Sequence, residues 1–107
     1  MANEKQFEHK VRKFLDEKGA YNIKYFGCAM TSAGVPDLLV CFKGIFFGIE
    51  LKAEDGKPSE LQLLNLRKIN KAGGVGVLLY PKDFERFKTL LNQFENNPQK
   101  FMELWAK

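Results

Sequence analysis

Residues 34–53, GVPDLLVCFKGIFFGIELKA, contain two apolar stretches on either side of Lys43 and Gly44. A turn signal between two β-prone stretches predicts a β-hairpin. The first arm, DLLVCF, is almost wholly apolar, which is typical of a strand covered on both faces. The hairpin also contains Asp37, Glu50 and Lys52, and buried charges need either a partner or a function.

The second arm divides its side chains between two faces, because successive strand residues point in opposite directions. One face is uniformly apolar and is predicted to be the core face, with Ile45, Phe47, Ile49 and Leu51. The opposite face carries Phe46, Gly48, Glu50 and Lys52. The two charged residues are therefore neighbours beside a glycine, which leaves space for another group.

The turn sets which residues of the two arms face each other. If it is centred on Lys43 and Gly44, counting outward places Asp37 directly across from Glu50. Directly opposed residues have Cβ atoms about 5 Å apart, so the two carboxylates repel each other and need a compensating cation. Lys52 is one candidate, and a divalent cation is the better one because hard oxygen ligands suit Mg²⁺ or Mn²⁺. A three-residue loop would shift the register by one residue and remove the pairing.

Helical and strand-like patterns alternate along the rest of the chain. Apolar residues at helical spacing predict a first helix over residues 4–18, and residues 21–27 resemble a strand. Ser59 is the expected cap of a helix that extends to residue 72, and residues 75–80 predict a fourth strand. An amphipathic helix follows, with a stripe of Phe84, Phe87, Leu91 and Phe94, and a short helix is expected within QKFMELWAK.

These segments predict one α/β domain over residues 1–107 with the order αβββαβα. The third and fourth strands flank a helix, which favours a parallel, right-handed crossover between them. The first three strands can pair as antiparallel neighbours. We therefore expect a mixed central β-sheet flanked by helices.

The composition narrows the class of protein further. The 107 residues are 45% hydrophobic and carry a net charge of +4, which fits attraction to nucleic acid. No stretch has the length of a membrane span and the first ten residues lack a signal-peptide pattern, so a cytoplasmic protein is expected.

Cys28 and Cys41 have no metal-ligand spacing and His9 is the one histidine, which excludes a zinc finger. Cys41 is interpreted as a small core residue.

Two polar residues on flanking helices border buried stripes. Glu8 lies three and seven residues before Val11 and Leu15. Gln62 lies four and seven residues before Leu66 and Ile69. Either side chain can reach a site at the edge of the sheet.

This pattern resembles the PD-(D/E)XK nuclease motif: Pro36-Asp37, twelve further residues, and then Glu50-Leu51-Lys52. The αβββαβ order is similar to the restriction-endonuclease-like core of that superfamily. Within the superfamily, the chain most resembles the VRR-NUC (virus-type replication-repair nuclease) group, through the stretches GVPDLLV, GIELKAEDGKPSELQ and AGGVGVLLY. It resembles the stand-alone form of this group, which is similar to Holliday-junction resolvases.

The resemblance implies a role for each matching residue. Asp37, Glu50 and the backbone carbonyl of Leu51 would bind Mg²⁺ or Mn²⁺, with Glu8 as a further ligand. Lys52 would orient the attacking water and stabilise the transition state, and Gln62 would be a fourth catalytic residue. The implied activity is metal-dependent endonuclease cleavage of branched or duplex DNA by a homodimer, without a small-molecule cofactor.

The same resemblance suggests DNA repair in a bacterial cell or a phage-infected host. Ser32, Lys24 and Lys57 are candidate DNA contacts. The exposed apolar residues of the last two helices are one candidate dimer interface. Two alternatives remain: a catalytically silent nucleic-acid-binding module, and an interaction protein whose charged trio is only a salt-bridge cluster.

Overall fold

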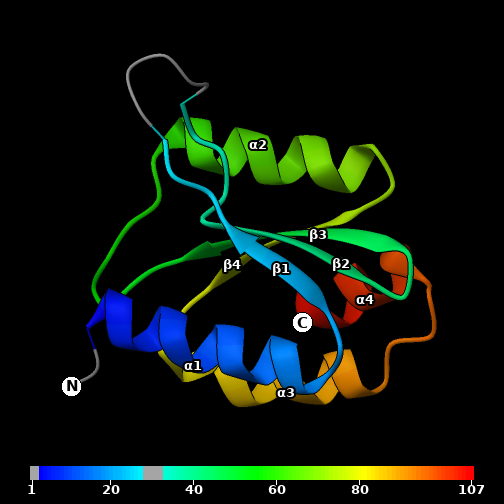
Figure 1. Cartoon of the computed structure of the whole chain (residues 1–107). Helices are drawn as coiled ribbons and strands as arrows, with labels where there is room; N and C mark the ends of the chain where they lie inside the picture. The colour runs from blue at the N-terminus through cyan, green and yellow to red at the C-terminus, as the bar shows by residue number, and fades with distance from the viewer. Residues whose placement is uncertain (1–2, 28–32) are drawn as a thin grey trace.

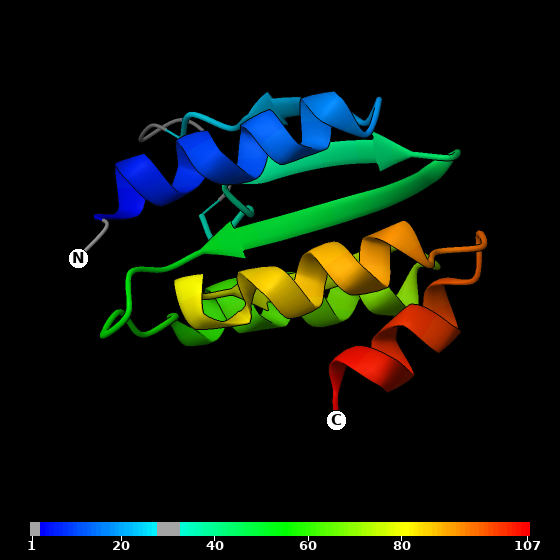
Figure 2. The ribbon, with the colours of Figure 1, turned by 90° about the horizontal axis from the view of Figure 1, so that it is seen from below.

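The computed structural model describes residues 3–27 and 33–107. It has three layers, with a β-sheet between two layers of helices (Figure 1). Its elements are α1 (Glu4–Glu17), β1 (Tyr21–Lys24), β2 (Leu38–Phe42), β3 (Ile45–Leu51), α2 (Glu60–Lys71), β4 (Val75–Leu79), the 3₁₀ turn η1 (Pro81–Asp83), α3 (Phe84–Asn92) and α4 (Pro98–Trp105). Helix α2 covers one side of the sheet, and α1 and α3 cover the other (Figures 1 and 2). The expected mixed α/β architecture is confirmed.

The sheet has the strand order β1-β2-β3-β4. Strands β1, β2 and β3 pair antiparallel, and β3 pairs parallel with β4, as the sequence predicts. Between β2 and β3, Phe42 faces Ile45 and Leu38 faces Ile49, which is the predicted register. Lys43 and Gly44 both have positive φ, 52° and 82°, so they form the two-residue turn that matches the twist of a hairpin.

The strands are shorter than the sequence predicts, although the chain continues in register beyond them. Strand β1 ends at Lys24, but the Tyr25 N–H still donates to the Asp37 carbonyl at 2.8 Å. Strand β2 begins at Leu38, so Asp37 is the residue just before it. The ends of β1, β3 and β4 and the start of β2 therefore meet at one edge of the sheet.

The main core lies between the sheet and α1, α3 and α4. Phe47, Ile49 and Leu51 are buried there, which confirms the predicted core face of β3. Phe47 packs edge-on against Phe94 and Phe101, with ring centroids 5.3 and 5.6 Å apart. Helix α3 ends at Asn92, before Phe94, yet Phe94 is buried as the predicted stripe requires.

On the opposite side, glycines let α2 approach the sheet closely. A Cβ on Gly48 would lie 2.4 Å from Ile69 Cδ1, and one on Gly76 would lie 2.5 Å from the Leu66 carbonyl oxygen. The space that the sequence leaves beside Gly48 is therefore filled by Ile69 of α2.

Helix α2 packs on β3 and β4, so part of the same sheet face stays open. Tyr21 faces Cys41, and Cys41 faces Phe46, in a row across β1, β2 and β3. All three are exposed, and Ile23 next to them is 43% exposed. We call these four residues the open sheet face. The interpretation of Cys41 as a core residue is wrong, because its side chain points to the half of the sheet that α2 does not cover.

None of the helices within residues 3–27 and 33–107 is long and apolar enough to cross a membrane.

Candidate metal centre

Asp37 and Glu50 meet at the sheet edge where β3 ends. The Leu51 N–H donates to Asp37 Oδ2 at 2.8 Å, so the Asp37 side chain caps the end of β3. Glu50, one residue earlier in β3, is only 2% exposed. The hairpin register continues one position beyond the ladder and places the two carboxylates together, as the sequence predicts.

The surroundings of Glu50 disfavour its charge. Burial, followed by repulsion from Asp37 and a hydrogen bond with it, raises the pKa of Glu50 to about 8, although Lys52 acts in the opposite direction. Lys52 Nζ lies 3.6 Å from Glu50 Oε2, which is an ion-pair contact rather than a close hydrogen bond. A single lysine therefore does not balance the two carboxylates.

Gln62 connects Glu50 to the start of α2. Its Nε2 donates to Glu50 Oε2 at 3.0 Å, and its Oε1 accepts from the Ser59 N–H at 2.9 Å. The Ser59 hydroxyl oxygen in turn accepts from the Gln62 N–H at 3.1 Å, which completes a capping box. The predicted helix cap and the predicted site residue are thus one structural unit.

The Lys52 side chain is held against the loop that follows β3. A Cβ on Gly56 would contact Lys52 Cβ and Cδ at 3.4 Å, and the Lys52 side chain is 16% exposed. The Tyr80 hydroxyl donates to the Gly56 carbonyl at 2.8 Å and fastens this loop. Sequence reasoning missed Tyr80, whose signal is its position directly after β4, next to the end of β3.

Glu8 reaches the same edge from α1. It forms an ion pair with Lys24 at the end of β1. Both residues line a hollow of about 560 Å³, whose further lining residues are Glu4, Lys5, Arg12, Phe26, Asp37 and Leu51. We call it the strand-end hollow. Arg12 is anchored beside it because its Nε donates to Asn22 Oδ1 at 2.9 Å.

The oxygen atoms at this edge fit a hard divalent cation. Asp37 and Glu50 supply two adjacent carboxylates, and Glu50 becomes fully ionised near neutral pH only if additional positive charge is close. The N–H and C=O of one strand residue point to the same side, so the Leu51 carbonyl faces the side of the Asp37 carboxylate. Within residues 3–27 and 33–107 no three His, Cys, Asp or Glu side chains form a metal-binding group. A cation at this edge would therefore also need the Leu51 carbonyl and water molecules as ligands.

Two of the three candidate DNA contacts, Lys24 and Lys57, lie in the described part of the chain. Lys24 lies at the strand-end hollow, paired with Glu8. Lys57 is exposed in the loop after β3, close in sequence to Lys52. Ser32 lies outside the described residues.

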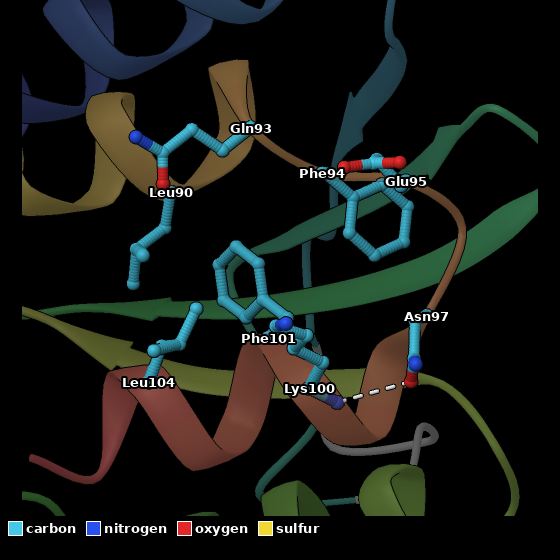
Figure 3. Close-up of a pocket in the computed structure, with 8 residues that line it drawn as sticks. All are labelled: Leu90, Gln93, Phe94, Glu95, Asn97, Lys100, Phe101 and Leu104. Atoms are coloured by element: carbon cyan, nitrogen blue, oxygen red, sulfur yellow. Dashed lines mark hydrogen bonds between the residues drawn. The ribbon is translucent and has the colours of Figure 1, made fainter.

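A second hollow lies between α3 and α4, with a volume of about 520 Å³. Figure 3 shows its lining residues: Leu90, Gln93, Phe94, Glu95, Asn97, Lys100, Phe101 and Leu104. Phe94 and Phe101 belong to the aromatic core, and Asn97 accepts from the Lys100 N–H as the cap of α4. These roles are structural, so the sheet edge remains the better candidate site.

Comparison with solved structures identifies similar folds. A structure described as a VRR_NUC domain has 26% sequence identity and a TM-score of 0.60, and the match covers 88% of this chain and all of that one. The Archaeoglobus fulgidus protein Hjc, a Holliday junction resolvase, has 19% identity and a TM-score of 0.53 over 72% of this chain and 69% of its own. No family model and no curated protein matches the sequence.

The chain therefore has the fold of a VRR-NUC and resolvase-like nuclease. This confirms the resemblance that the spacing of Asp37, Glu50 and Lys52 suggests, at the level of the fold.

Proposed function

We propose that this protein is a divalent-metal-dependent endonuclease that hydrolyses phosphodiester bonds in branched or duplex DNA. The observation that carries the proposal is the meeting of Asp37 with the buried Glu50 at the sheet edge, next to Lys52. Two carboxylates in this position cost stability unless they hold a cation. The similarity to a VRR_NUC domain and to a Holliday junction resolvase supports DNA as the substrate.

The ligands in this proposal are the Asp37 and Glu50 carboxylates and the Leu51 carbonyl, with Glu8 as a further ligand that Lys24 now neutralises. A bound Mg²⁺ or Mn²⁺ supplies positive charge at the phosphate and lowers the pKa of a coordinated water.

The remaining roles belong to the chain itself. Lys52 places a positive charge beside Glu50, where it stabilises negative charge that develops on the phosphate and orients the attacking water. Gln62 fixes the orientation of the Glu50 carboxylate through its Nε2. Lys24 and Lys57, with Ser32, would contact the DNA backbone and carry no sequence preference.

The main alternative is a DNA-binding module without catalysis. It would require the same basic residues but not the trio of Asp37, Glu50 and Lys52. Glu50 contacts both Asp37 and Lys52, which supports the enzyme.

The test is cleavage of a panel of junction, flap, nicked and linear duplex DNA with Mg²⁺ or Mn²⁺, followed by addition of chelator. Wild-type protein should cut at least one substrate in a metal-dependent way. Lys52→Ala should reduce cutting at least 100-fold (roughly, as for loss of one transition-state charge) and leave DNA binding nearly unchanged. Lys100→Ala, on α4, is the matched control and should cut normally.

If purified wild-type protein cuts nothing with either metal, the enzyme proposal fails. Cutting that is unaffected by Lys52→Ala would remove Lys52 from the mechanism.

We also propose that the protein acts as a homodimer, so that two sites can serve two strands. The sequence places a candidate interface on the last two helices, but Phe87, Leu91 and Phe101 there are buried core residues. The open sheet face is the better candidate, because Tyr21 is 69% exposed and Phe46 is 44% exposed in a row without charge. An uncharged apolar face does not repel a copy of itself.

Tyr21→Glu tests this interface. It would place two charges near the two-fold axis and should convert a dimer to a monomer in light scattering after gel filtration. Leu104→Glu, on α4, is the control and should leave the mass unchanged. The reverse result would return the interface to the last helix.

A further inference from the structure

Phe26 is the most exposed of the large apolar residues in the described part of the chain. It is 76% exposed. It lies two residues beyond the end of β1 and lines the strand-end hollow together with Asp37 and Leu51. An exposed aromatic ring is therefore positioned beside the candidate catalytic residues.

The hairpin register explains why the ring is there. The Tyr25 N–H donates to the Asp37 carbonyl, so the pairing of the two chain segments continues one residue beyond β1 and β2. Side chains alternate along this stretch, which places Phe26 on the same side as Lys24, facing α1. The ring thus stands at the rim of the hollow rather than on the open sheet face.

Three basic side chains line the hollow with the ring, and so do the carboxylates of Glu4, Glu8 and Asp37. Lys24 Nζ lies 5.5 Å from the Phe26 ring centroid, and Lys5 and Arg12 line the same hollow. Lys24 is paired with Glu8, so Lys5 and Arg12 are the basic side chains of the hollow that no acidic partner within the described part of the chain already holds in an ion pair. An exposed aromatic ring close to such cations can bind single-stranded nucleic acid, since the ring stacks on a base and the cations contact phosphates. A fully paired duplex does not present a free base face to such a ring.

We propose that Phe26 stacks on an unpaired base next to the phosphate that is cut, and so favours DNA with a branch point or a splayed end. This inference rests on the proposed nuclease function for the identity of the ligand. It adds a residue that selects the substrate and that takes no part in the chemistry.

The experiment measures binding without cleavage. Full-length Lys52→Ala protein is titrated with a splayed duplex that carries 2-aminopurine at the first unpaired position, and with a fully paired duplex of the same sequence. Stacking on Phe26 should quench the 2-aminopurine fluorescence. Phe26→Leu keeps an apolar side chain of moderate size but removes the aromatic face, and should lose the quenching and bind the splayed DNA roughly tenfold more weakly.

Three comparisons make the result specific. Phe26→Trp should retain the quenching, because it restores an aromatic face. The affinity of Phe26→Leu for the paired duplex should stay within about twofold of the parent protein. Leu104→Ala changes an exposed apolar residue on α4, away from the strand-end hollow and the open sheet face, and should bind both DNAs as the parent does.

Unchanged quenching in Phe26→Leu, or an equal loss of affinity for both DNAs, would overturn the inference. A change in molecular mass of this variant without a change in DNA binding would assign the ring to a protein contact instead. If wild-type protein binds and quenches but never cuts, the nuclease proposal fails while the stacking site stands.

Discussion

Among the described residues, Glu50 is the charged one whose side chain is buried. It is nearly fully buried, it lies beside Asp37, and its ionised form has only a 3.6 Å contact to Lys52 and one amide donor from Gln62. A carboxyl group kept near its point of ionisation at neutral pH changes its charge readily when a cation or a phosphate arrives. This property, more than the ligand spacing, distinguishes the site from an ordinary surface ion pair.

The first prediction concerns the pH dependence of stability in the presence of chelator. The pKa of Glu50 is raised from 4.5 to about 8, so between these values the unfolded chain has lost the Glu50 proton and the folded chain keeps it. The folded state then binds more protons, and the free energy of unfolding falls as pH rises from about 4.5 to about 8. Glu50→Gln should remove this contribution, so the variant gains stability relative to wild type as pH rises.

Urea denaturation at several pH values measures the difference. Glu103→Gln, an exposed carboxyl on α4, should run parallel to wild type throughout. Parallel curves for Glu50→Gln as well would show that the Glu50 pKa is not raised in the folded protein.

At the level of single residues, the sequence predicts the meeting of Asp37 and Glu50 because a two-residue turn leaves only one register. It does not predict the degree of burial of Glu50, which depends on Gln62 and on the close approach of α2. It also fails for Cys41, since an apolar strand looks the same whether a helix covers one of its faces or stops short of it.

At the scale of elements, α2 links stability to the site. Its first turn holds Glu50 through Gln62, and Gln62 is held by Ser59. Gln62 takes part in the cap of α2 and also orients the Glu50 carboxylate. If the first turn of α2 unfolds, Glu50 therefore loses its hydrogen-bond donor.

The second prediction compares two helix caps. Ser59→Ala and Asn97→Ala each remove a cap and should each lower the free energy of unfolding by about 1 kcal/mol. Only Ser59→Ala should also lower the rate of DNA cleavage, because only the cap of α2 positions Gln62. The measurements are thermal unfolding and single-turnover cleavage below the unfolding transition.

Equal cleavage rates for the two cap variants would separate Gln62 from the cap and contradict this link. A loss of cleavage in Asn97→Ala would show instead that general stability limits the activity.

The elements themselves are largely predictable, and their ends are not. The glycine and proline residues between the apolar stretches predict the correct number and order of strands. Ser59 predicts the start of α2. Strand β2 starts at Leu38 rather than at Asp37, and Asp37 uses its carboxylate to bind the Leu51 N–H of β3. Phe94 is predicted on a helix but packs from the loop after α3, since burial does not require helical geometry.

At the scale of the whole molecule, aromatic side chains join the last two helices to the sheet. Phe101 contacts four other rings: Phe47, Phe87, Phe94 and Trp105. These contacts lie on the opposite side of the sheet from α2. The aromatic cluster and the contact between Glu50 and Gln62 therefore lie on different faces of the sheet.

The third prediction follows from this separation. Phe101→Ala should lower the free energy of unfolding by about 3–5 kcal/mol, because it leaves a cavity among the rings. At temperatures where the variant is still folded, its metal-dependent DNA cleavage should match wild type. Chemical denaturation and cleavage assays on the same preparation test both statements, and a folded variant with lost cleavage would contradict the separation.

The hairpin also bears on the order in which the elements fold. Asp37, Glu50 and Lys52 all belong to one hairpin with a two-residue turn, and hairpins form within about 1–10 μs. The parallel pairing of β3 with β4 must wait until the chain between them has folded back as α2. We therefore expect the two carboxylates to come together before Gln62 arrives and while water still surrounds them. Their repulsion should then slow formation of the hairpin as well as lower the final stability, and Glu50→Gln should speed folding if the hairpin forms early.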